Sequence, residues 1–129
     1  MLKSGILNPH IHHLLARIRH TNTLVISDRG FPFWPQIETV DISLTDDIPR
    51  VLDVLRAIRA NFIVGAAFMA QEFTTHNAPA IRQEFATAFE GVPLTFEPHL
   101  EFKTRVPRAI GLIRTGDTTP YANMIIESA

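Results

Sequence analysis

The chain of 129 residues contains no cysteine. This absence excludes disulfides, iron–sulfur clusters, thiolate zinc sites and thiol nucleophiles. Charged residues make up only 19% of the chain, and 12 basic against 13 acidic side chains leave a net charge of −1. A protein so close to neutral lacks the positive field that nucleic acids or anionic lipids require. We therefore expect no nucleic-acid partner and no membrane partner.

Long hydrophobic runs are also missing. The apolar stretch over residues 62–70 is far shorter than the ~20 residues that cross a bilayer. Pro9 and the histidines after it interrupt the N-terminal segment, which lacks the apolar core of a signal peptide. These features predict a soluble, cytoplasmic protein. Low charge together with a slightly positive mean hydropathy indicates apolar surface that an oligomer hides.

The pattern of apolar residues predicts one α/β domain over residues 1–129. Asn8 followed by Pro9 is a helix-start signal, and Thr45, Asp46 and Asp47 form a second one. We expect helices over 9–20, 45–60, 78–89 and 99–104, and strands over 23–27, 37–42, 62–69, 93–96, 109–114 and 122–126. Their alternation predicts a three-layer α/β/α domain with a largely parallel, mixed sheet.

Two loops of this predicted sheet are candidates for a ligand site. In open α/β sheets the ligand crevice lies beyond the carboxyl ends of the strands, which directs attention to residues 28–35 and 115–121. The first loop contains two prolines and three aromatic residues between Phe31 and Pro35, so it cannot be regular structure and we expect it to cover apolar surface. The chain has no glycine-rich phosphate loop and no Gly-x-Ser-x-Gly motif. Proton transfer by side chains is the chemistry that remains.

A cluster of His10, His12 and His13 raises the alternative of a metal-dependent hydrolase. His13 and His20 share a helical face, but seven residues separate them by ~10.5 Å along the helix axis, too far for one ion. No carboxylate lies near them in the sequence. We therefore interpret the cluster as a solvated helix face and expect no metal site.

The other polar residues are individually ordinary. His20 ends the first predicted helix, where an imidazole interacts favourably with the helix dipole, and Asp28 follows the next strand, where turn-forming aspartates are common. Because that strand separates them, the sequence by itself does not bring His20 to Asp28. A set of hydrogen-bonding groups suited to a sugar is completed by His99, Lys103, Tyr121 and Asn123.

Three stretches of the sequence are characteristic in combination: residues 5–10 (GILNPH), residues 26–28 (ISD) and above all residues 113–123 (IRTGDTTPYAN). With them the chain resembles the D-ribose pyranase and L-fucose mutarotase family over essentially its whole length. The Arg-Thr-Gly run with Pro-Tyr-Ala-Asn is closer to the ribose pyranase branch.

This resemblance implies an isomerase of the cytoplasm that interconverts cyclic forms of a free monosaccharide, D-ribose first, without metal or cofactor. It implies pentameric rings, often stacked as decamers, with each site at a subunit boundary, so that His20 and Asp28 meet from different copies. It further implies His20 as the catalytic acid and base, and sugar contacts from Asp28, His99, Lys103, Tyr121, Ala122 and Asn123.

Two alternatives stay open at this point. An L-fucose-type mutarotase and a non-catalytic sugar-binding accessory of an uptake system would use the same crevice. The aromatic residues 31–34 and the acidic pair Asp46 and Asp47 depart from the usual ribose pyranase pattern, which leaves the choice of sugar open.

Overall fold

Six strands form one mixed sheet in the computed structural model, which describes all residues 1–129. Every pair of neighbouring strands is parallel except the pairs that involve β6, which runs antiparallel to both β1 and β3. The predicted α/β fold with a largely parallel, mixed sheet is confirmed. The order across the sheet is β2 (Glu38–Asp41), β5 (Gly111–Arg114), β1 (Thr23–Ser27), β6 (Met124–Ser128), β3 (Val64–Ala70) and β4 (Leu94–Glu97).

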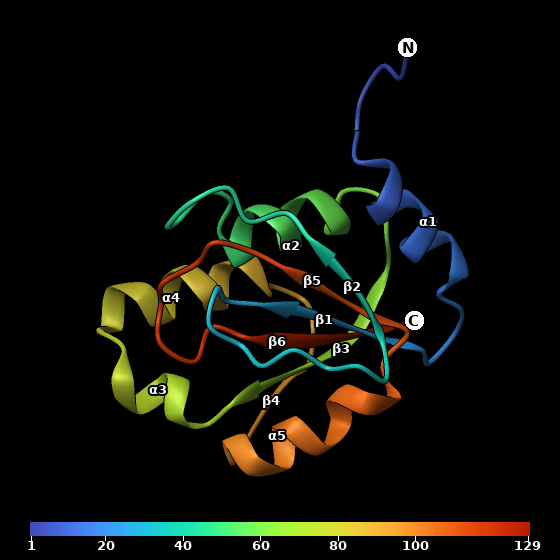
Figure 1. Cartoon of the computed structure of the whole chain (residues 1–129). Helices are drawn as coiled ribbons and strands as arrows, with labels where there is room; N and C mark the ends of the chain where they lie inside the picture. The colour runs from blue at the N-terminus through green and yellow to red at the C-terminus, as the bar shows by residue number, and fades with distance from the viewer.

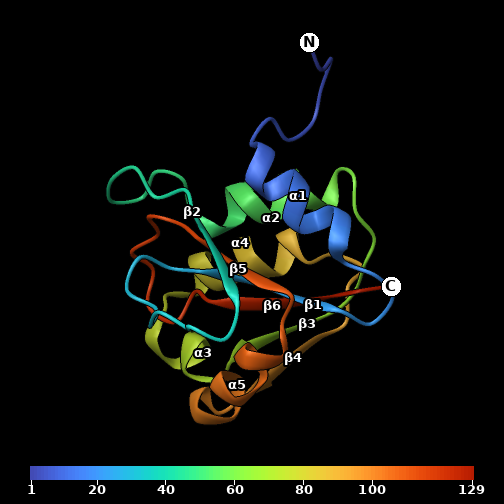
Figure 2. The same ribbon diagram turned by 45° about the vertical axis from the view of Figure 1, so that its right-hand side comes forward.

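Alternate residues of the central strands bury the two faces of this sheet, as the period of two in a strand requires. On β1, Leu24 and Ile26 join the larger hydrophobic cluster, whereas Val25 joins the smaller one. Helices α1 (Pro9–Arg17), α2 (Val51–Arg59) and α4 (Pro79–Ala88) cover the first face. Helix α5 (His99–Arg105) and the 3₁₀ turn η1 (Val106–Arg108) cover the second, which gives the three layers seen in Figures 1 and 2.

The first helix begins as predicted but ends early. The side chain of Asn8 accepts hydrogen bonds from the backbone N–H groups of His10 and Ile11, and Pro9 occupies the first helical position. The helix ends at Arg17 rather than at residue 20, because Ile18 adopts an extended conformation with its side chain buried. The chain then turns through His20 and Thr21 into β1.

The second predicted helix starts later than expected. Residues 45–48 form a turn closed by a bridge between Thr45 and Ile48, and α2 begins only at Val51. Pro49 explains the difference, because a residue that precedes proline is disfavoured in helical conformation. Ile48, which falls within the predicted helix, lies in this turn and is exposed.

One short helix is absent from the sequence prediction. Helix α3 (Glu72–His76) follows β3 directly and buries Phe73. The other predicted elements are present, with ends that differ by at most two residues. The aromatic loop carries no regular structure, and Phe31 packs edge-on against Phe102 with ring centroids 6.2 Å apart. None of the helices has the length and apolar character needed to span a membrane.

Candidate functional site

Residues from three distant parts of the chain meet at one edge of the sheet. Asp28 follows the carboxyl end of β1, and His99 follows that of β4. Because β6 runs antiparallel to β1, the residues that precede β6 lie at this same edge. Tyr121 and Asn123 therefore lie beside Asp28. This proximity depends on the antiparallel direction of β6.

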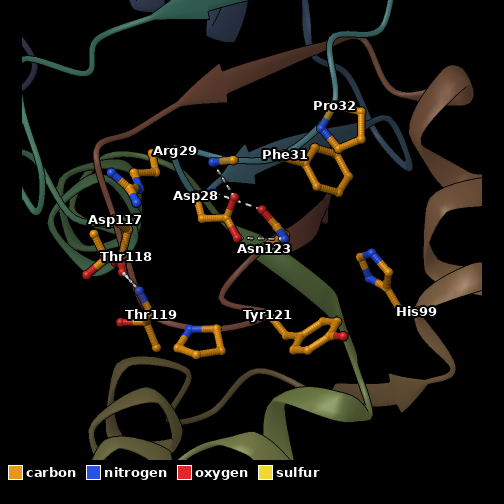
Figure 3. Close-up of a pocket in the computed structure, with 12 residues that line it drawn as sticks. Asp28, Arg29, Phe31, Pro32, His99, Asp117, Thr118, Thr119, Tyr121 and Asn123 are labelled. Atoms are coloured by element: carbon orange, nitrogen blue, oxygen red, sulfur yellow. Dashed lines mark hydrogen bonds between the residues drawn. The ribbon is translucent and has the colours of Figure 1, made fainter.

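A cavity of about 330 Å³ opens at this edge. Figure 3 shows Asp28 and Asn123 at its back, His99 and Tyr121 on one side, and Arg29 with residues 117–119 on the other. Both loops that the sequence analysis selected contribute to it. Its lining consists of Asp28, Arg29, Gly30, Phe31, Pro32, His99, Asp117, Thr118, Thr119, Pro120, Tyr121 and Asn123.

Asp28 and Asn123 form a double hydrogen bond. The Asn123 Oδ1 atom accepts from the Asp28 backbone N–H at 2.8 Å, and Nδ2 donates to Asp28 Oδ2 at 3.2 Å. The other carboxylate oxygen, Oδ1, accepts from the Gly30 N–H at 3.0 Å. Burial raises the pKa of Asp28, although the hydrogen bonds from Gly30 and Asn123 oppose this effect. The carboxylate is thus held in place while its charge is destabilised by burial, as in many acid–base sites.

His99 begins α5 and faces the ring of Tyr121, with centroids 5.2 Å apart at an angle of 82°. Its backbone N–H donates to both carboxylate oxygens of Glu72 at 3.1 Å. Burial, together with the positive charge of Lys103, lowers the pKa of His99, which favours a neutral imidazole. Its Nδ1 atom is buried and has no hydrogen-bond partner within the protein. Since buried polar atoms are normally paired, a ligand hydroxyl is a suitable partner.

The remaining expected contact residues differ in their placement. Tyr121 lines the cavity and has a left-handed backbone with φ 55°. Ala122 is fully buried behind it and does not line the cavity. Lys103 lies one turn after His99 on α5 and is half-buried; its influence in this chain is its charge on His99.

His20 lies at the opposite end of β1 from Asp28. It is exposed in the turn that precedes this strand, and the five residues of β1 span ~17 Å at about 3.3 Å per residue. Within one chain His20 is therefore not part of the cavity that contains Asp28, His99, Tyr121 and Asn123.

The structure adds Asp117 to the residues that the sequence analysis singled out. Its side chain is 2% exposed; Oδ2 accepts from the N–H of Val51 at 2.9 Å and Oδ1 accepts from the N–H of Thr119 at 2.7 Å. Asp117 thereby joins the start of α2 to the cavity wall. Its place at the carboxyl end of a parallel strand was the available signal.

The titratable side chains of the chain form no metal-binding cluster. No group of three or more His, Asp or Glu side chains converges in an arrangement that would hold an ion. His12, from the histidine cluster, contacts the backbone carbonyl of Ile6.

Comparison with known proteins places this chain in a family. Residues 1–129 match the RbsD / FucU transport protein family. D-ribose pyranase of Geobacillus kaustophilus is 40% identical over 128 residues, which cover 99% of this chain and 93% of that protein. D-ribose pyranase of Chromobacterium violaceum is 43% identical over 129 residues, with 99% and 97% covered.

Solved structures agree with this match. The structure of Bacillus subtilis RbsD complexed with D-ribose superimposes with a TM-score of 0.93 at 32% identity and covers 100% of this chain and 98% of that one. Fucose mutarotase from Streptococcus pneumoniae, in complex with L-fucose, has a TM-score of 0.83 at 18% identity over 99% and 98% of the two chains, a likeness of fold alone. The family inferred from residues 113–123 is confirmed: this chain belongs to the RbsD / FucU transport protein family.

Proposed function

We propose that this chain is an isomerase that interconverts the cyclic forms of a free monosaccharide, with D-ribose as its substrate. The observation that carries the proposal is the cavity with Asp28 and Asn123 at its back, which presents several hydrogen-bonding groups to a ligand of sugar size. Relatives named D-ribose pyranase, 40% and 43% identical over nearly the full chain, support the choice of sugar. One domain over residues 1–129 carries the site.

The reaction requires two proton movements. Opening a cyclic hemiacetal removes the proton of the anomeric hydroxyl and protonates the ring oxygen, and reclosure by a different hydroxyl or on the other face gives the new ring form. Positioned acids and bases contribute ~10²–10⁴-fold each to such steps. Neither a redox cofactor nor an activated leaving group takes part, so side chains can supply all of the chemistry.

In this proposal the cavity residues hold the sugar. Asn123 offers an amide donor and acceptor for hydroxyl pairs, and Tyr121 offers a phenol and an apolar ring face. His99, neutral because burial lowers its pKa, can donate at one ring nitrogen and accept at the other. Asp28 accepts from a hydroxyl, Lys103 adds a positive charge near His99, and the buried Ala122 supports the wall.

His20 transfers the proton, and it does so from a neighbouring copy of the chain. Within one chain, His20 and Asp28 lie at opposite ends of β1. The family resemblance, however, implies that both residues belong to one site. A closed ring of five copies, single or stacked as ten, satisfies both conditions because each cavity then lies at a subunit boundary. We place this assembly in the cytoplasm.

Saturation-transfer NMR on free sugars tests the activity, since it detects exchange between ring forms at equilibrium, where no net product accumulates. D-ribose is expected to exchange faster in the presence of the protein, and L-fucose serves as the comparison. Faster exchange of L-fucose alone would replace ribose with the mutarotase alternative, and no acceleration of any sugar in the panel would refute the isomerase.

One alternative has an observation in its favour. The family description names transport, which fits a non-catalytic accessory that binds sugar for an uptake system. Such a protein would bind D-ribose in calorimetry without accelerating its exchange. The two measurements on one preparation therefore separate the enzyme from the accessory.

A further inference from the structure

The loop between β2 and α2, residues 42–50, is interlocked with the loop between β5 and β6. The Asp47 N–H donates to the Gly116 carbonyl at 2.6 Å, and the Gly116 N–H donates to the Pro49 carbonyl at 2.9 Å. A methyl group at Gly116 would overlap the carbonyl oxygen of Thr45 and lie 3.0 Å from that of Ile48. The contact thus depends on glycine, and it fixes residues 45–49 against a wall of the cavity.

Two aspartates of this loop each hold a side chain that lines the cavity. Oδ1 of Asp47 accepts from both the backbone N–H of Thr118, at 3.0 Å, and its hydroxyl, at 2.8 Å. Asp46 forms an ion pair with Arg29 at 2.6 Å. Thr118 and Arg29 lie together on the side of the cavity that faces His99 and Tyr121 (Figure 3).

We propose that Asp47 is a positioning residue for sugar binding, which acts through Thr118 by holding both its backbone and its hydroxyl on the cavity wall. This inference rests on the proposed function and extends it to a loop outside the cavity. The acidic pair that departs from the usual ribose pyranase pattern thereby has a role, because it orders the wall opposite His99.

The contact chemistry explains why Asp47 suits this position. Thr118 is exposed, and Asp47 supplies the acceptor for both its backbone N–H and its hydroxyl. Asp47 has a left-handed backbone with φ 63°, a conformation that Asp, Asn and Gly tolerate better than other residues. Hydrogen bonds from Thr118 lower the pKa of Asp47, so the acceptor stays ionised at neutral pH.

Three substitutions separate the acceptor from the backbone conformation. Asp47→Asn keeps an acceptor oxygen and a residue that tolerates positive φ. Asp47→Gly keeps only the backbone freedom, and Asp47→Ala keeps neither. Asp41→Ala is the matched control, since Asp41 Oδ1 also accepts from a backbone N–H and a hydroxyl, those of Ser43 at 2.9 and 2.5 Å, and Ser43 does not line the cavity.

Exchange rates at several D-ribose concentrations give KM and kcat, calorimetry gives the affinity, and circular dichroism checks folding. We expect Asp47→Gly and Asp47→Ala to raise KM and weaken ribose affinity by about three- to tenfold, with kcat changed less than about twofold. Asp47→Asn and Asp41→Ala should stay within about twofold of the wild type.

Unchanged KM and affinity in both Asp47→Gly and Asp47→Ala would overturn the proposal, even if their melting temperatures fell. So would an Asp47→Asn variant as impaired as Asp47→Gly. If the wild type bound ribose without exchanging it, the proposed isomerase would fail, and the affinities of the same variants would still decide the role of Asp47. A wild type that binds no sugar would overturn both.

Discussion

Asn123 holds Asp28 through two hydrogen bonds of opposite direction, across 95 positions of sequence. It accepts from the Asp28 backbone at 2.8 Å and donates to the Asp28 carboxylate at 3.2 Å. Asn123 is only 3% exposed, so both bonds are largely shielded from bulk solvent. The pair joins the end of β1 to the start of β6 and forms the back of the cavity.

Replacing Asn123 with alanine is therefore expected to affect both stability and sugar binding. Leaving a buried polar group without its hydrogen-bond partner costs roughly 1–3 kcal/mol. In this variant the backbone N–H and the carboxylate of Asp28 each lose one partner. We expect the free energy of unfolding to fall by about this amount in urea titrations, and ribose affinity to fall at least about tenfold in calorimetry. Wild-type affinity in this variant would show that the pair is not part of the binding site.

His20→Ala should separate catalysis from folding. His20 is an exposed turn residue, so its truncation is expected to change stability by no more than about 0.5 kcal/mol. If it transfers the proton, accelerated exchange should drop by ~10²-fold or more, with the oligomer unchanged in light scattering. Exchange at the wild-type rate would remove His20 from the mechanism.

Mixed oligomers test whether the cavity and His20 come from different copies. Co-expression of His20→Ala with Asp28→Asn chains should recover activity in about a quarter of the sites by random pairing, although each variant alone is inactive. The recovery arises because an intact cavity meets an intact His20 across a boundary. A mixture as inactive as its parents, or an active monomer of 14.5 kDa, would contradict shared sites.

The pH dependence of ribose binding should report His99. Its pKa is lowered from 6.5, first by burial and then by the charge of Lys103, so between the folded and unfolded pKa values the unfolded chain binds more protons. The part of the stability and of the ribose affinity that depends on a neutral imidazole is therefore fully present above pH 6.5. It is lost as the pH falls through the lowered pKa of His99 in the folded chain. NMR titration of the His99 ring, assigned with His99→Gln, checks this; a pKa at or above 6.5 would contradict it.

Gly116→Ala should destabilise the protein, whereas Gly30→Ala should not. The added methyl at Gly116 meets the backbone carbonyls of Thr45 and Ile48, which cannot move independently of the loop. Such overpacking costs roughly 1–3 kcal/mol. At Gly30 the nearest atom is Asp28 Oδ1 at 3.9 Å, an ordinary contact. Equal midpoints of urea unfolding for the two variants would show that the loops are not interlocked in solution.

Local signals explain which elements the sequence predicted well. Asn8 and Pro9 start α1 through a side-chain cap and a fixed φ, both properties of adjacent residues. The predicted start of α2 was wrong because two effects compete there. Thr45 to Asp47 have the composition of a cap, but Pro49 delays the helix, and the N–H of Val51 is capped by Asp117 from 66 positions away.

The sequence predicted the succession of helices and strands apart from α3, the two loops that carry polar groups, and the family through residues 113–123. These depend on the spacing of apolar residues and on neighbouring residues. Two features became apparent only in the folded chain. Strand β6 runs antiparallel between β1 and β3, which brings Asn123 to Asp28, and the loop at Asp47 holds Thr118. Strand direction and loop contacts are set by hydrogen bonds and packing between segments far apart in the chain, and such pairings leave no periodic trace in the sequence.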